Sequence, residues 1–253
     1  MMKTPIFRTL MVASMAVLAL NGFTAYAQMP GADGPPGMTA ALTKMFGDIK
    51  AFTAKAEIQV LNSAQEELAS MPMNFALLDK KVRVDIDMTQ TKSANMPPGA
   101  TAVLQQMGMA QVVSIIRPDK KTAYVFYPNA KVMMTLPVPE ETSASLSKTE
   151  LGKETVDGHP CVKNRVAVKD ENGKEIEVIT WNATDLKNFP IQIKTQEKEN
   201  TSFVRFKGVQ FNQPETGQFE PPAGYTQYNS PEDLMRGVLA KTTSGAGTKS
   251  EKK

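Results

Sequence analysis

Apolar and polar residues alternate without interruption over residues 81–88 (KVRVDIDM). A period of two predicts a β-strand with one buried and one solvated face. The preceding residues, 73–78, are predicted to pair with this strand across a turn at Asp79 and Lys80. We expect four side chains of the strand to point into the protein: Val82, Val84, Ile86 and Met88.

The same alternation recurs along the chain and predicts further strands. Pro118 occupies the second position of a predicted turn, and Asn172-Gly173 is a strong hairpin signal. With roughly nine to eleven strands and a turn about every eight to twelve residues, the pattern is typical of a sandwich or a barrel. The additional predicted strands cover residues 111–116, 122–127, 131–136, 161–169, 175–181, 190–197 and 203–211.

Three segments predict helices instead. A helix is expected near the C-terminus, where Ser230 can cap it and Pro231 suits its first position. A short helix is expected at residues 101–107, inside an insertion at 94–108 that interrupts the strands. Before the first strand, apolar residues recur at helical intervals and predict an amphipathic helix: Leu42, Met45, Phe46, Ile49 and Phe52.

The amino terminus has the three zones of a cleavable secretory signal. Lys3 and Arg8 precede an uncharged apolar run at 10–20, which is shorter than the roughly 20 residues that span a bilayer. Ala25 and Ala27 form a small-x-small pattern, so cleavage is predicted after Ala27. The protein is therefore expected in the periplasm or outside the cell, with no transmembrane segment in the mature chain.

These signals divide the chain into four parts. Residues 1–27 are the predicted signal peptide, and the Gly/Pro-rich residues 28–38 are a predicted flexible lead-in. Residues 39–240 are predicted to form one β domain. Residues 241–253, with four lysines and one glutamate, are predicted to be a disordered basic tail.

Composition narrows the functional classes. Hydrophobic residues make up 41% of the chain, which is enough for a substantial core. The formal charge of +3 falls to about −2 for the domain once the charged residues of the signal and the tail are set aside. The domain therefore lacks the basic surface that nucleic acid requires. Cys161 is the only cysteine, which excludes a disulfide within the chain.

Candidate catalytic residues are few. His159 is the only histidine, so a typical zinc site is not expected. His159 and Cys161 would share one face of a strand, and we interpret them as a turn histidine and a buried thiol rather than as a base and its nucleophile. The sequence has no nucleophile elbow, phosphate-binding loop or dinucleotide-binding motif. We therefore expect no catalysis, no bound metal and no cofactor.

Methionine is the unusual component, with 16 residues in a chain that has one tryptophan. Methionine side chains fill gaps in cores, and they also line cavities that accept ligands of variable shape. Their thioethers are in addition soft ligands that favour Cu(I). The sequence leaves these three interpretations open. Six of the methionines form close pairs: Met71 and Met73, Met107 and Met109, Met133 and Met134.

Longer stretches carry a resemblance to known proteins. They are the strand–turn–strand–turn–strand at 112–136, GKETVDGHPC at 152–161, WNATDLKNFP at 181–190 and FEPPAGY at 219–225. Over residues 51–235 the chain resembles an uncharacterised domain-of-unknown-function family of secreted bacterial proteins. That family is itself similar to the LolA/LolB-like periplasmic lipoprotein carriers.

The resemblance implies a mainly β fold: a curved, antiparallel, half-open β-barrel with an N-terminal helix, a short inserted helix and a C-terminal helix. It also implies a soluble periplasmic protein that holds lipid or lipoprotein acyl chains in the concave face of the sheet, with an outer-membrane or lipoprotein partner as a further expectation. The carriers lock a helix with an arginine, for which Arg83 and Arg117 are the candidates here. The predicted apolar lining is Val82, Val84, Ile86, Met88, Val103, Leu104, Met107, Val125 and Met134.

Two other functions remain open from the sequence. In one, the concave face is packed shut and the protein is a structural or protein-interaction module. In the other, the protein is a methionine-rich copper binder, for which thioethers clustered near His159 and Cys161 would be the evidence. For the carrier, the insertion at 94–108 would act as an apolar flap over the concave face.

Overall fold

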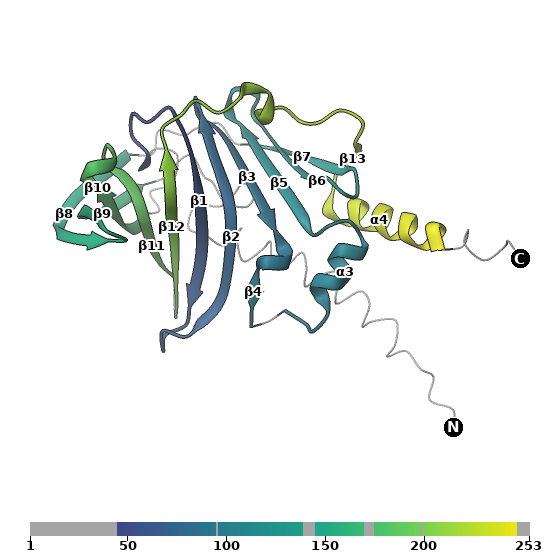
Figure 1. Ribbon diagram of the computed structural model, residues 1–253, viewed down its shortest axis with the longest axis horizontal. Coiled ribbons are helices and arrows are strands. Elements are labelled where there is room, and N and C mark those ends of the chain that lie inside the picture. Colours follow the sequence, from purple (N-terminus) through teal and green to yellow (C-terminus); the bar gives the residue numbers. More distant parts are fainter. Residues whose placement is uncertain (1–44, 95, 139–144, 170–174, 198, 247–253) are drawn as a thin grey trace, which may run out of the picture.

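The structure, a computed structural model, describes residues 45–94, 96–138, 145–169, 175–197 and 199–246 (Figure 1). Within these residues, 13 strands form one sheet in the order β13-β7-β6-β5-β3-β2-β1-β12-β11-β10-β9-β8, and β4 pairs with β2 beside this path. Neighbouring strands are antiparallel except β13 and β7. The predicted fold class, mainly β with one open antiparallel sheet, is confirmed.

The sheet consists of two antiparallel meanders joined where β1 pairs with β12. The first meander contains β1 (Ala51–Leu61), β2 (Glu67–Leu78), β3 (Lys81–Asp87), β5 (Gln111–Arg117), β6 (Thr122–Tyr127) and β7 (Val132–Pro137). The second contains β8 (Ser145–Val156), β9 (His159–Lys169), β10 (Glu175–Ala183), β11 (Phe189–Glu197) and β12 (Asn200–Gln210). The two short strands are β4 (Lys92–Ser93) and β13 (Thr226–Tyr228).

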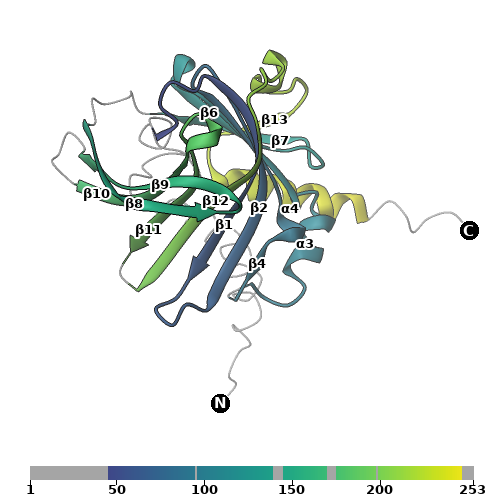
Figure 2. The same ribbon diagram turned by 60° about the vertical axis from the view of Figure 1, so that its left-hand side comes forward.

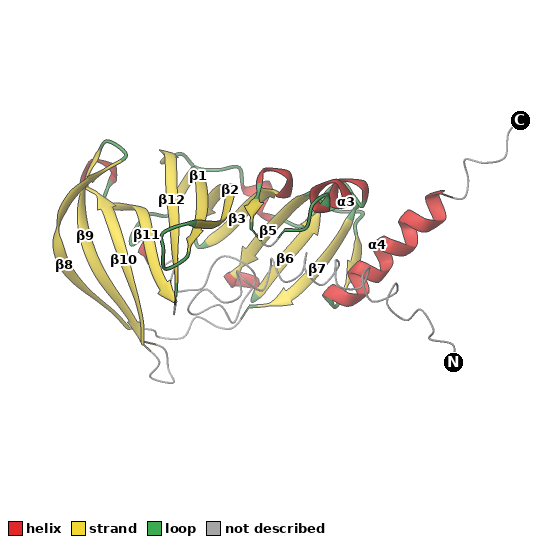
Figure 3. Ribbon diagram, turned by 90° about the horizontal axis from the view of Figure 1, so that it is seen from below, coloured by secondary structure: helices red, strands yellow, loops and turns green. Residues whose placement is uncertain are grey.

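The sheet curves strongly across its width, so that it has a concave and a convex face (Figures 2 and 3). Its ends are β8 and β13, which leaves the barrel half-open. Helix α4 (Pro231–Ala246) contacts β7 and β13, and α3 (Ala100–Gln106) lies in the connection between β4 and β5. Neither described helix is long and apolar enough to cross a membrane. The remaining turns of helix are η1 (Met88–Gln90), η2 (Pro118–Lys120), η3 (Thr184–Leu186) and η4 (Thr216–Phe219).

The hairpin between β2 and β3 has the predicted position and register. Leu78 pairs with Lys81, which leaves a two-residue turn. Asp79 and Lys80 have φ angles of 46° and 69°, the left-handed conformation that matches such a turn to the twist of its strands. The alternation of β3 is also as predicted, because Val82, Val84 and Ile86 are buried.

The C-terminal helix begins as predicted and ends later. The backbone N–H of Asp233 donates to Ser230 Oγ (3.1 Å), so Ser230 is the cap, and Pro231 is the first helical residue. The helix continues to Ala246, which places the expected boundary at Lys241 inside α4.

The expected N-terminal helix does not extend as far as its apolar stripe suggested. Among the described residues, only Met45 is helical there, and Phe52 lies in β1. β1 itself was not predicted, although Phe52, Ala54 and Ala56 alternate in burial with the residues between them. Two of those inward residues are alanines, which fit a helix as well as a strand and hide a period of two. Residues 39–44 and the whole predicted signal peptide, with Ala27, lie outside the described residues.

Candidate functional site: the concave face of the sheet

Rows of buried side chains run across the concave face from strand to strand. Strand register places Val84 on β3 opposite Ser114 on β5, and Ser114 opposite Val125 on β6. The row continues to Met134 on β7 in one direction and to Phe75 on β2 in the other. The adjacent row contains Leu136, Ala123, Ile116, Val82, Leu77 and Phe52.

Most of the predicted lining residues lie on this face or against it. Met88 in η1 and Leu104 in α3 are buried in the same hydrophobic cluster as the strand residues, and Met107 packs against that cluster. Val103 is the exception, because 48% of it is exposed. The predicted lining residues that are buried on the strands are Val82, Val84, Ile86, Val125 and Met134.

Five phenylalanines form a compact group at the middle of the sheet, where the two meanders meet. The Phe52 ring stacks on Phe75 with centroids 5.3 Å apart, and Phe206 meets Phe75 edge-on at 5.6 Å. Phe46, from the segment before β1, stacks on Phe189 at 5.3 Å. Such ring pairs add to the free energy gained by burial. The sequence did not predict this aromatic group, because its members are far apart along the chain.

The methionines gather at the β2–β7 end of the concave face. Met71, Met88, Met109, Met134 and Met235 are buried in the concave cluster, which shows them packed among aliphatic side chains.

One buried hydroxyl interrupts the aliphatic surface of the first meander. Ser114 is only 4% exposed, and among the described residues its Oγ has no hydrogen-bond partner. Tyr127 lies two residues beyond Val125 on β6 and is also buried. Burial raises the pKa of its phenol to about 12, so the group stays protonated at neutral pH.

In the second meander, buried polar groups satisfy one another. Asn182 Oδ1 accepts from Asn164 Nδ2 (3.0 Å) and from Thr180 Oγ1 (2.8 Å). Asn182 Nδ2 in turn donates to the carbonyl oxygen of Asn188 (2.9 Å). Because buried polar groups cost free energy when they are unpaired, this network stabilises the second meander.

His159 and Cys161 do not form a nucleophile and its base. The Cys161 thiol donates to the backbone carbonyl of His159 (3.4 Å), and burial raises the pKa of this thiol. The His159 ring instead has Asp185 as its partner, with Nδ1 and Oδ2 2.7 Å apart. Asp185 was not predicted as a partner of His159, because it lies 26 residues away in the sequence and only η3 brings it to the ring.

A copper site of clustered thioethers is not found at this position either. Neither β8 nor β10, the strands that flank β9, contains a methionine. Among the described residues, no group of three or more His, Cys, Asp or Glu side chains could hold a metal ion.

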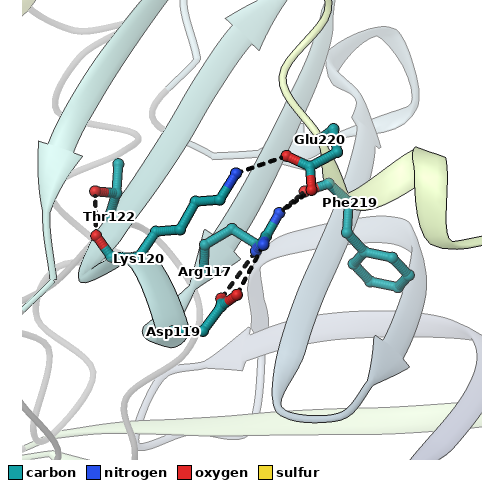
Figure 4. Close-up of polar contacts among 6 residues, drawn as sticks. All are labelled: Arg117, Asp119, Lys120, Thr122, Phe219 and Glu220. Carbon is teal, nitrogen blue, oxygen red and sulfur yellow. Dashed lines mark hydrogen bonds and ion pairs between the residues drawn. The ribbon is translucent and has the colours of Figure 1, made fainter.

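The two candidate arginines lie on the convex face, where they bind the short helical turn η4 rather than α3 or α4. Arg117 binds Asp119 through two hydrogen bonds, of 2.8 and 2.7 Å, and also reaches the Phe219 carbonyl (3.2 Å) and the Glu220 carboxylate (Figure 4). Arg83 donates to the Gln218 carbonyl (2.8 Å). Both arginines therefore fasten residues 216–220, called the strap below, to the outside of the sheet. The expected arginine that locks a helix is therefore corrected: both arginines bind the short turn η4 on the outside of the sheet.

The strap closes a second, smaller hydrophobic cluster on the convex face. Phe219 is fully buried there, and Tyr225 meets Phe126 edge-on with ring centroids 5.7 Å apart. The carboxylates of the strap region are held ionised: hydrogen bonds from Arg117 lower the pKa of Asp119, and hydrogen bonds from Lys120 and Arg117 lower the pKa of Glu220. The sheet residues of the cluster are Ala76, Leu78, Val113, Ile115, Phe126 and Met133.

No family model and no curated protein matches the sequence. The chain is similar to a LolA superfamily protein from Nitrosomonas europaea, with 10% identity, a TM-score of 0.36, and coverage of 73% of this chain and 99% of that one. It is also similar to a DUF1329 family protein from Desulfovibrio piger, with 10% identity, a TM-score of 0.36, and coverage of 72% and 94%.

A third similar structure is the lipoprotein LppX from Mycobacterium tuberculosis, with 10% identity, a TM-score of 0.39, and coverage of 70% of this chain and 96% of that one.

Proposed function

We propose that the protein holds an apolar ligand, a lipid or a lipoprotein acyl chain, against the concave face of its sheet and performs no catalysis on it. The observation that carries this proposal is the extent of the apolar face. It spans both meanders, whereas the described helices bury only four side chains in it: Leu104 from α3, and Leu234, Met235 and Val238 from α4. Ligand pockets are lined mainly by hydrophobic side chains of this kind.

The chemistry of the face also favours binding over reaction. Arg117 is the only buried charged residue in the part of the chain that the structure describes, and it lies on the convex face. The concave lining is aliphatic and methionine-rich, a surface that adapts to chains of different length and branching. The predicted signal at residues 1–27 supports export of such a carrier to the periplasm or beyond, where lipids pass between membranes.

The inserted helix α3 serves as a flap in this proposal. It begins at Gly99, whose φ of 81° is left-handed, and ends before Gly108, whose φ is 70°. Between them, Leu104 points into the concave cluster and Val103 is exposed. A helix with one buried side chain has little to hold it down, so it can move aside for a ligand at small cost.

A closed structural module is the alternative that one observation favours. Phe46 packs against four phenylalanines at the middle of the sheet, which shows that the chain's own residues fill that part of the concave face. The carrier proposal therefore places the ligand beside this group, toward the methionine-rich end between β2 and β7.

Displacement of an apolar fluorescent dye tests the proposal. We expect micromolar binding, about −8 kcal/mol. Leu104→Ser should weaken binding severalfold, because it adds a polar group to the flap's contact. Val103→Ser is the matched control on the exposed side of the same helix and should leave binding unchanged. A folded protein that binds no dye, or equal losses from the two variants, would contradict the proposal.

A further inference from the structure

Ser114 occupies the centre of the proposed ligand surface. Its neighbours across the sheet are Val84 and Val125, and its neighbours along the same face of β5 are Val112 and Ile116. An alanine would continue this aliphatic pattern, and its side chain is close in size to that of serine. The chain nevertheless places a hydroxyl there.

That hydroxyl has lost its contact with water without gaining a partner. Ser114 Oγ and Thr91 Oγ1 are the two buried side-chain polar atoms without a hydrogen bond in the described part of the chain. The buried polar groups of the second meander, such as Asn182, are in contrast fully paired. An unpaired buried donor destabilises a fold, so its position amid a binding surface points to a ligand that completes it.

We propose that Ser114 donates a hydrogen bond to the carbonyl oxygen of a neutral acyl ester when a lipid lies on the concave face. This inference rests on the proposed function and adds the chemical class of the ligand. An ester suits the site because it combines long apolar chains with one uncharged acceptor. An ester carbonyl of this kind occurs in glycerolipids and in the diacylglyceryl group of a lipoprotein alike.

A free fatty acid fits the site less well than an ester does. Its ionised carboxylate would need a cation or several donors once it is removed from water. The described residues that are buried on the concave face provide no cation, because Arg117 faces the opposite side of the sheet. The Tyr127 hydroxyl, on the same face of the adjacent strand, is a second neutral donor near the site. The surroundings therefore select an uncharged acceptor.

Two probes that differ only in the linkage test this assignment. 1-Monooleoylglycerol carries an ester, and 1-O-oleylglycerol carries an ether in its place, so only the first offers a carbonyl. Each would be titrated against the full-length exported protein by dye displacement. The wild type should bind the ester about tenfold more tightly, as expected for one buried hydrogen bond. Ser114→Ala should remove that preference by weakening the ester alone.

Val125→Ala is the control, because it removes apolar contact beside Ser114 and should weaken both probes alike. Thermal melting of each variant would accompany the titrations, and Ser114→Ala should not lower the melting temperature, since it removes an unpaired hydroxyl. Equal binding of the two probes by the wild type, or an ester preference that survives Ser114→Ala, would overturn the inference and leave the carrier proposal standing. If the folded wild type bound neither probe, both proposals would fall.

Discussion

The two faces of the first meander are closed in different ways. The convex cluster is covered by the chain itself: the strap buries Phe219, and Arg117 and Arg83 tie down the backbone on either side of that ring. The concave cluster is much larger, is covered by few side chains of the described helices, and contains the unpaired hydroxyl of Ser114.

This difference distinguishes a face with a structural role from the face proposed to bind a ligand. A face that needs only to be stable is closed by the chain itself, as the ion pair between Arg117 and Glu220 of the strap illustrates. A face that binds a ligand instead has an apolar lining and an unpaired hydrogen-bonding group that the ligand can use. Changes on the two faces should therefore have distinct consequences.

The largest effect is expected from a charge placed on the concave face. Ile86→Asp puts a carboxylate at a site that is 8% exposed, and burying an unpaired charge costs several kcal/mol. The domain should be unfolded or nearly so, as measured by circular dichroism. Val103→Asp is the matched control and should shift the free energy of unfolding by less than about 0.5 kcal/mol. Similar effects from both variants would show that the burial of β3 is wrongly assigned.

The next effect concerns the strap. Phe219→Ala removes a fully buried ring from the convex cluster and should lower the free energy of unfolding by about 3–5 kcal/mol. Gln218→Ala is its control, because Arg83 contacts only the backbone carbonyl of Gln218. Chemical denaturation measures both. Among molecules that remain folded, Phe219→Ala should bind the apolar dye as the wild type does, and a lost affinity would mean that the two faces are coupled.

Much of the first meander could be predicted from sequence, because β3 alternates cleanly and the turns carry recognisable residues. β8 could not be predicted in this way. It is an edge strand whose described side chains are mostly polar on both faces, and its Leu151 is 41% exposed, so no period of two marks it. β1 could not be predicted for a related reason, because its inward alanines do not mark a period of two.

The residues of the candidate site likewise divide into those that could be predicted from sequence and those that could not. Inward residues of β3 such as Val84 and Ile86 could be predicted from alternation alone, since burial there follows the period of two. The role of Arg117 could not, because its partner Glu220 lies 103 residues away and only the folded chain brings the two together. The unpaired state of Ser114 is likewise a property of three adjacent strands rather than of one segment.

A smaller effect is expected from acid. Asp119 and Glu220 have pKa values below their ordinary 3.8 and 4.5, so their contribution to stability is complete at neutral pH and is lost as the pH falls through and below those values. Both carboxylates are about half exposed, so the contribution is modest. Hydrogen exchange at residues 216–220 should rise at low pH before exchange in β3 and β5 does. Glu220→Gln should show part of this rise already at neutral pH, and a strap that exchanges no faster in acid would contradict the ion-pair assignment.

Mass spectrometry of the organic extract from the protein purified from its own host tests the central claim most directly. The account predicts an ester-linked acyl lipid in near-stoichiometric amount, with less lipid retained by Leu104→Ser than by Val103→Ser. Extracts of the folded wild-type protein that contain no lipid above the background of a control protein from the same cells would contradict the claim that the concave face is a carrier surface.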